Sequence, residues 1–200
     1  EESLGYLAGD HARDKDASVA ALYLAELAAE LREEGKTLLD RLDELYVEHG
    51  YYTEGQQSVV SRGEQGQQQI RQLMDQFRND PPTELASVSF GRVRDYGRHE
   101  IRSLPLNETA EPLPEPRDNL MFFETENTEP RIALAVRPSG TEPKIKFYTF
   151  AQAACDQADG LAELKQKMDE QLALFQQELS VWVGEVLKRL DNDTSPETGS

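Results

Sequence analysis

The spacing of apolar residues in the first quarter of the chain predicts two amphipathic helices. Over 16–34 apolar side chains recur every three or four residues, Asp16 can cap the first turn, and Gly35 supplies the C-terminal stop. A second apolar stripe follows Thr37, which can also act as a cap, and it ends before Gly50. We therefore expect two helices, with a boundary in the chain immediately after them.

After Gly50 the pattern changes to short strands and one further helix. A β-prone run occupies 57–62, and apolar positions at helical spacing occupy 65–77, before Pro81 and Pro82 stop the helix. Further strands are predicted at 88–96, 119–125, 131–136 and 144–150, with an extended, proline-rich loop or linker at 103–118. This order indicates an α+β domain with its helices on one face of a largely antiparallel sheet.

The last helical pattern, over 161–190, has the strongest periodicity in the chain. One interpretation is a coiled-coil helix that binds a partner or dimerises, which would make the chain a non-catalytic α+β interaction module. The other is a long amphipathic helix packed across the sheet, with a break near Ser180 or Gly184 left open. We favour the packed helix, because the flanking charges are irregular and a single sheet needs a cover. The polar residues 191–200 predict a disordered tail.

The net charge argues against two classes of partner. With 21 Lys and Arg against 38 Asp and Glu, the chain has a formal charge of −17, whereas nucleic-acid binding requires a broad positive surface. The longest apolar stretches are about five residues, far below the roughly 20 residues that span a bilayer. We therefore expect neither nucleic acid nor a membrane as a partner, and the oligomeric state is left open.

Cysteine and histidine usage argues against a metal or disulfide framework. Cys155 is the single cysteine, so no internal disulfide or thiolate-rich zinc site is expected, and the three histidines lack ligand spacing. No N-terminal signal pattern is present, and a reducing, cytoplasmic location is the expectation. The chain begins at Glu1 rather than at a methionine, which suggests that it is part of a longer protein.

One short window reverses the charge and contains the most informative motif. Residues 131–150 hold four basic residues and one acidic residue, so a cationic patch interrupts an acidic protein. Within the window, the run RPSGTEPK at 137–144 offers an arginine fork, two hydroxyls, and a glycine at which backbone N–H groups can turn inward. Lys144 and Lys146 alternate with apolar residues, so both should lie on one strand face. These groups suit a phosphate dianion, but they also suit an ordinary polar turn, and residue types alone leave both interpretations open.

At this motif the sequence resembles a known family. Residues 137–148, RPSGTEPKIKFY, resemble the phosphate-binding loop in the C-terminal domain of the α-D-phosphohexomutases, the phosphoglucomutase/phosphomannomutase superfamily. Residues 1–6 and 9–16, EESLGY and GDHARDKD, resemble the sugar-recognition loop of the same family, and the two motifs occur in the family's order. The segment 44–52 is most similar to the branch of phosphoglucomutase 2-like and phosphopentomutase enzymes.

The resemblance implies a fold and a division of the chain. It implies four domains around a cleft, with residues 1–50 forming the C-terminal part of the third, sugar-recognition α/β domain. Residues 51–190 would form the fourth, phosphate-binding α+β domain, with a TATA-box-binding-protein-like antiparallel sheet and helices on one face. Residues 191–200 would remain the disordered tail.

The resemblance also implies an activity. The family's enzymes are isomerases that interconvert sugar 1-phosphate and sugar 6-phosphate in carbohydrate metabolism, by intramolecular phosphotransfer through a phosphoserine. A sugar 1,6-bisphosphate is the intermediate and activator, and Mg²⁺ is the metal. Both the phosphoserine and the Mg²⁺ ligands would lie upstream of these residues, so this portion alone is expected to be inactive.

Individual roles carry over by position. Phosphate contacts with a phosphosugar substrate are implied for Arg137, Ser139, Gly140, Thr141 and Lys146. Glu1 and Ser3 would hydrogen-bond the sugar hydroxyls, and Lys15 resembles the family's active-site lysine near the sugar. Leu4 stands where relatives often have glycine, so the choice among glucose, mannose and pentose phosphates is left open.

Overall fold

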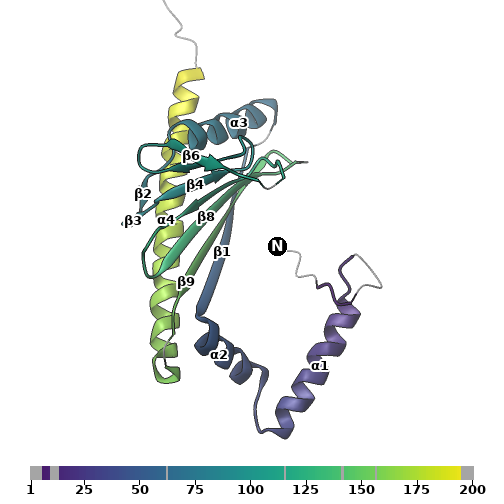
Figure 1. The fold of residues 1–200 in the computed structure, drawn as a ribbon. Coiled ribbons are helices and arrows are strands. Elements are labelled where there is room, and N and C mark those ends of the chain that lie inside the picture. The colour runs from purple at the N-terminus through teal and green to yellow at the C-terminus, as the bar shows by residue number, and fades with distance from the viewer. Residues whose placement is uncertain are drawn as a thin grey trace, which may run out of the picture.

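The centre of the molecule is a seven-stranded antiparallel sheet of order β1-β9-β8-β7-β4-β5-β6 (Figure 1). The computed structural model describes residues 6–9, 14–61, 63–114, 116–140, 142–155 and 157–194. The strands of the sheet are β1 (Tyr51–Val60), β4 (Arg92–Asp95), β5 (Glu100–Ser103), β6 (Glu108–Pro112), β7 (Met121–Glu124), β8 (Arg131–Pro138) and β9 (Lys144–Ala153). A separate hairpin pairs β2 (Glu84–Leu85) with β3 (Val88–Ser89).

Two helices, α3 (Gly63–Asn79) and α4 (Leu161–Thr194), cover one face of this sheet (Figure 1), with a short 3-10 turn η1 (Ala158–Gly160) before the second. Side chains along β9 alternate between this covered face and the opposite one, so every second residue is buried. The largest fully buried side chains are Phe77, Phe123, Phe147 and Phe175. No helix of the described residues lies across the opposite face (Figure 1). The predicted α+β class, with helices on one face of an antiparallel sheet, is confirmed.

The long helix α4 packs against the sheet and does not present its apolar stripe to solvent. Its buried residues are Leu161, Met168, Leu172, Phe175, Leu179, Val183 and Val186. The helix is continuous through Ser180 and Gly184, and it extends to Thr194, four residues into the segment predicted as a tail. The stripe that suggested a coiled coil is therefore part of the hydrophobic core.

The helices α1 (Ala17–Glu33) and α2 (Leu38–His49) have the predicted capping residues. The Asp16 carboxylate accepts the N–H groups of Ser18 and Val19, and Thr37 forms a reciprocal capping box with Asp40. The ring of Tyr46 in α2 packs edge-on against Tyr51 at the start of β1, with 4.9 Å between ring centroids. By contrast, α1 packs against α2 and lies away from the sheet (Figure 1), with large apolar side chains exposed: Leu22, Tyr23, Leu24 and Leu27.

Three predicted boundaries differ from the observed ones. The single strand predicted over 88–96 is two strands in different sheets, because the backbone changes partners at Phe90 and Gly91: the N–H of Phe90 donates to Thr83 and that of Gly91 to Glu124. The stretch 103–118, predicted as a loop because of its prolines, contains the edge strand β6. This strand ends at Pro112, and a proline is tolerated there because the strand lies at the edge of the sheet. The β-prone run at 57–62 is the end of the longer strand β1.

Candidate anion-binding site

Two cations face each other across the β8–β9 hairpin. Arg137 and Lys146 are register partners on these strands, on the face that no described helix covers. Lys144 lies on the same face two residues before Lys146, as the alternation predicted, and the Lys146 ammonium lies 6.0 Å from the centroid of the Tyr148 ring. Like charges directly opposite in an antiparallel pair destabilise a sheet. The arrangement therefore concentrates positive charge at this end of the hairpin, at some cost to the pairing of the two strands.

The turn that joins these strands is closed by its own polar groups. The Ser139 N–H donates to the Lys144 carbonyl at 2.8 Å, and the Lys144 N–H donates to the Glu142 carbonyl at 2.8 Å. The Ser139 hydroxyl accepts the N–H of Glu142 at 3.3 Å, which leaves its O–H available as a donor. A Cβ placed on Gly140 would meet no atom within 4 Å. The turn thus places a hydroxyl donor beside open space.

The basic residues of the hairpin differ in how firmly they are paired. Lys144 lies 2.5 Å from the Glu142 carboxylate in the same turn, and this hydrogen bond and charge hold the pKa of Glu142 below its ordinary value. The Arg137 guanidinium lies 3.5 Å from Asp118 (Nη2 to Oδ2), and both of these side chains are 47% exposed. An exposed pair of this length contributes little to stability. Arg137 is therefore accessible to an external anion, whereas Lys144 is held by its neighbour.

Two hollows adjoin the turn. One, of about 550 Å³, lies on the uncovered sheet face and is lined by Arg137 together with the aromatic rings of Tyr96, Phe122, Tyr148 and Phe150. The other, of about 280 Å³, lies between the turn and α3 and is lined by Ser139, Gly140, Asn119 and Arg71, among others. The turn residues and Arg137 thus border open space on both sides of the hairpin end.

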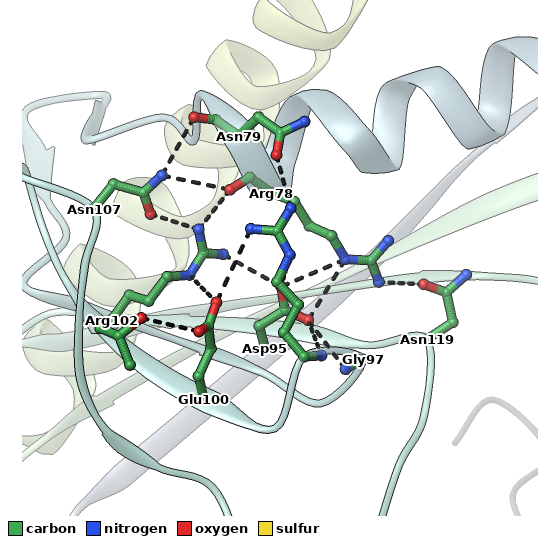
Figure 2. A network of polar contacts seen from close by, with 10 residues as sticks. Arg78, Asn79, Asp95, Gly97, Glu100, Arg102, Asn107 and Asn119 are labelled. Carbon is green, nitrogen blue, oxygen red and sulfur yellow. Dashed lines mark hydrogen bonds and ion pairs between the residues drawn. The ribbon is translucent and has the colours of Figure 1, made fainter.

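A buried polar network supports the segment beside the turn (Figure 2). Asp95 has no solvent exposure, and its carboxylate lies 3.4 Å from both Arg78 and Arg102. Arg102 is 2% exposed, and burial lowers the pKa of its guanidinium. Arg78, at the end of α3, donates to the side-chain oxygen of Asn119, which directly follows Asp118. The network therefore links the interior to the residues that flank Arg137.

The structure places the predicted site residues in separate groups. Arg137, Ser139, Gly140 and Lys146 lie together on the β8–β9 hairpin. Lys15 directly precedes Asp16, the capping residue of α1, and α1 lies away from the sheet (Figure 1). Three residues with predicted roles, Glu1, Ser3 and Thr141, are outside the described residues. Asp118, Asn119 and Arg71 were missed by sequence reasoning, because a polar pair after a proline-rich stretch and one arginine on a helix give no distinctive signal.

The described part of the chain contains no group of three or more His, Cys, Asp or Glu residues arranged to hold a metal ion. Within the same residues, no helix has the length and apolar character needed to cross a membrane. The β8–β9 hairpin offers arginine, lysine and hydroxyl groups, which can bind an anion.

Comparison with known proteins identifies relatives of the chain. Residues 1–49 match the family model for phosphoglucomutase/phosphomannomutase, alpha/beta/alpha domain III. A phosphoglucomutase of Staphylococcus haemolyticus is 40% identical over 151 residues, covering 74% of this chain and 26% of that protein. A phosphoglucomutase of Staphylococcus aureus is 32% identical over 163 residues, covering 82% of this chain and 28% of that protein. The similarity therefore continues well beyond the domain III match, and the chain spans about a quarter of the length of these relatives.

Among solved structures, a match is found to the di-domain ARO/CYC BexL from the BE-7585A biosynthetic pathway, with 16% identity over 65% of this chain and 46% of that one. Its TM-score of 0.28 is too low to indicate a shared fold. The sequence similarities first define the class: the chain is homologous to an isomerase. More particularly, it belongs to the phosphoglucomutase/phosphomannomutase family, of which it represents part of domain III and the region downstream.

Proposed function

We propose that this chain is the substrate-gripping portion of an enzyme that interconverts sugar 1-phosphate and sugar 6-phosphate. Its β8–β9 hairpin would hold the phosphate group that is not reacting. The observation that carries the proposal is the cross-strand pair of Arg137 and Lys146 beside the Ser139 turn. Two cations opposite each other on one sheet face offer two positive charges that a single dianion can bind at once.

The chemistry of this grip follows from the groups present. The planar guanidinium of Arg137 can donate two parallel hydrogen bonds to phosphate oxygens, and Lys146 adds a compact positive charge. The Ser139 hydroxyl and the open backbone at Gly140 can donate further hydrogen bonds. Since phosphoryl transfer depends mainly on positioning and charge stabilisation, a clamp on the distant phosphate can raise the rate at the reacting one.

The remaining roles in the proposal come from the family resemblance. A phosphoserine outside this chain would exchange its phosphoryl group with the sugar through a sugar 1,6-bisphosphate. Glu1 and Ser3 would hold the sugar hydroxyls in either orientation, Thr141 would join the phosphate contacts, and Lys15 would lie near the sugar. The similarity of 44–52 favours the phosphoglucomutase 2-like and phosphopentomutase branch.

Mg²⁺, which the family implies, finds no set of ligands among the described residues, and we assign none of this chain's residues to it. The contribution of the chain to catalysis would be binding and orientation. By itself it would therefore not catalyse the reaction, and its direct readout is the binding of a phosphate group.

The competing hypothesis of a non-catalytic module that dimerises through its last helix loses its main support. The apolar stripe of α4 is buried against the sheet, and burial there leaves no equivalent stripe for a partner helix. The described part of α4 instead serves as the cover that a one-layer sheet requires.

The test is Arg137→Ala in the full-length enzyme, with Arg131→Ala as the matched control. Arg131 is an exposed arginine on the same strand and the same face, opposite Gln152 at the far end of β8. We expect kcat/KM for glucose 1-phosphate to fall about 10²-fold in Arg137→Ala, because bidentate, charge-assisted hydrogen bonds are lost. Arg131→Ala should retain wild-type kcat/KM. An unchanged kcat/KM in Arg137→Ala would rule out the proposed grip.

A further inference from the structure

The side chain of Asn119 is oriented by the interior of the protein. The guanidinium of Arg78 donates to Asn119, and since arginine carries only donors, it must face the amide oxygen of Asn119. Arg78 is itself held by the fully buried Asp95, at 3.4 Å. With its oxygen engaged, Asn119 presents its NH₂ group away from the network (Figure 2). Asn119 therefore offers a pre-oriented donor.

This donor lies next to the proposed phosphate grip. Asn119 follows Asp118, whose carboxylate contacts Arg137, and Asn119 lines the same hollow of about 280 Å³ as Ser139 and Gly140. Arg137 itself lines the other hollow, on the uncovered sheet face. A phosphate bound at the end of the hairpin, beside Ser139, would then have Arg137 on one side and the Asn119 side chain on the other. Pre-oriented donors bind an anion without the cost of ordering a free side chain.

The same hollow is also lined by one cation, Arg71, and by Glu142, whose carboxylate is paired with Lys144. Arg71 is exposed on α3, seven residues before Arg78, and a spacing of two helical turns places both on the same helix face. Within the described residues no ion pair involves Arg71, whereas Arg78 is committed to Asp95 and Asn119. One arginine of this face therefore builds the network, and the other borders the hollow.

We propose that Asn119 and Arg71 form a second wall of the phosphate site, on the α3 side of the turn, with Asn119 donating from its amide nitrogen and Arg71 adding charge. The inference rests on the proposed function, because it takes a phosphate monoester dianion as the ligand of the hairpin. It adds that the site is completed by a residue of α3 and a residue of the segment between β6 and β7.

The experiment measures the dissociation constant of inorganic phosphate for this chain at pH 8, from the chemical-shift changes of backbone amides. Asn119→Asp keeps the oxygen that accepts from Arg78 but replaces the donor by a negatively charged oxygen. Its control is Asn79→Asp, because the Asn79 oxygen likewise accepts from an arginine, Arg98, at 2.8 Å and Asn79 does not line the hollow. Arg71→Gln is compared with Arg189→Gln, an exposed arginine on α4.

We expect Asn119→Asp to weaken phosphate binding at least about tenfold and Arg71→Gln about threefold, since the first replaces a donor by a like charge and the second removes a screened charge. Both control variants should bind phosphate as the wild type does. Wild-type affinity in both Asn119→Asp and Arg71→Gln, or equal losses in the controls, would overturn the inference. Arg137→Ala separates the two proposals. If Arg137→Ala weakens phosphate binding and neither Asn119→Asp nor Arg71→Gln does, the second wall is wrong and the proposed grip of the hairpin stands. If all three variants bind phosphate as the wild type does, both proposals are wrong.

Discussion

The Arg137 guanidinium lies 3.5 Å from the carboxylate of Asp118, so the arginine proposed to bind phosphate already has an anion of its own chain beside it. Both side chains are half exposed, and such a pair is weak and screened by salt. A phosphate dianion would carry more charge than the carboxylate and would compete with it for the same donors. Asp118 is therefore expected to oppose ligand binding.

We predict that Asp118→Asn tightens the binding of inorganic phosphate about threefold, because it removes a competing charge from the site. The dissociation constant from an amide chemical-shift titration checks this. Asp159→Asn, at an exposed aspartate of η1, makes the same change of charge away from the hairpin. Equal tightening in both variants would mean that only the net charge matters, and weaker binding in Asp118→Asn would mean that the carboxylate orients Arg137.

The Asp95 network makes a prediction for stability. Asp95 accepts the backbone N–H groups of Gly97 and Arg98 at 3.0 and 3.1 Å. Its carboxylate also lies beside three guanidinium groups, those of Arg78, Arg98 and Arg102. Asp95→Ala leaves the buried Arg102 without that partner. We expect the free energy of unfolding to fall by about 3–5 kcal/mol, as for one partner removed from a buried ion pair.

Urea unfolding followed by circular dichroism measures this loss. Asp75→Ala, at an exposed aspartate of α3, is the control and should change stability by no more than about 0.5 kcal/mol. If Asp95→Ala were as stable as the control variant, the buried network would contribute little to the stability of the protein.

The sequence predicts an element well when residues close in the chain determine it, and poorly when pairing with a distant segment determines it. The caps of α1 and α2 depend on residues within three positions of Asp16 and Thr37, and they were predicted. The strand β6 depends on pairing with β5 and consists of exposed residues among prolines, so no local pattern indicates it. Likewise, the split at Phe90 and Gly91 reflects two different hydrogen-bonding partners that lie elsewhere in the chain.

The site divides in the same way. The RPSGTEPK motif is contiguous, so its residues could be singled out from the sequence, and the alternation that places Lys144 and Lys146 on one face is confirmed. Asn119 and Arg71 come from other elements and reach the same hollow only through the packing of α3 on the sheet. Because that packing joins residues about fifty positions apart, sequence spacing carries no information on it.

The packing of α4 makes a third prediction, in which two leucines of the same helix differ in burial. Leu179 has no exposure, whereas Leu174 is 50% exposed. Leu179→Ala is expected to lower the free energy of unfolding by about 2–5 kcal/mol, because it removes buried methyl groups and leaves a cavity. Leu174→Ala should change it by no more than about 0.5 kcal/mol. Urea unfolding gives both values, and a larger loss for Leu174→Ala than for Leu179→Ala would point to an interface on the outer face of α4.

The capping box of α2 makes a prediction for pH. The Asp40 carboxylate accepts the Thr37 hydroxyl at 2.8 Å and the Thr37 N–H at 2.7 Å, and these hydrogen bonds hold the pKa of Asp40 below its ordinary value. Because the pKa is lower in the folded state, the box stabilises the protein above the ordinary pKa of an aspartate. That stabilisation is lost as the pH falls through the lowered value.

Thr37→Ala removes the hydroxyl donor and should therefore raise the pKa of Asp40 toward its ordinary value. A titration of the side-chain carboxyl carbon by NMR measures the pKa directly in the folded protein. Thr128→Ala, which removes a hydroxyl that donates to the Pro130 carbonyl, should leave the Asp40 titration unchanged. If Thr37→Ala also left the Asp40 titration unchanged, the hydroxyl would not be the cause of the lowered pKa, and the helix would depend on its backbone cap alone.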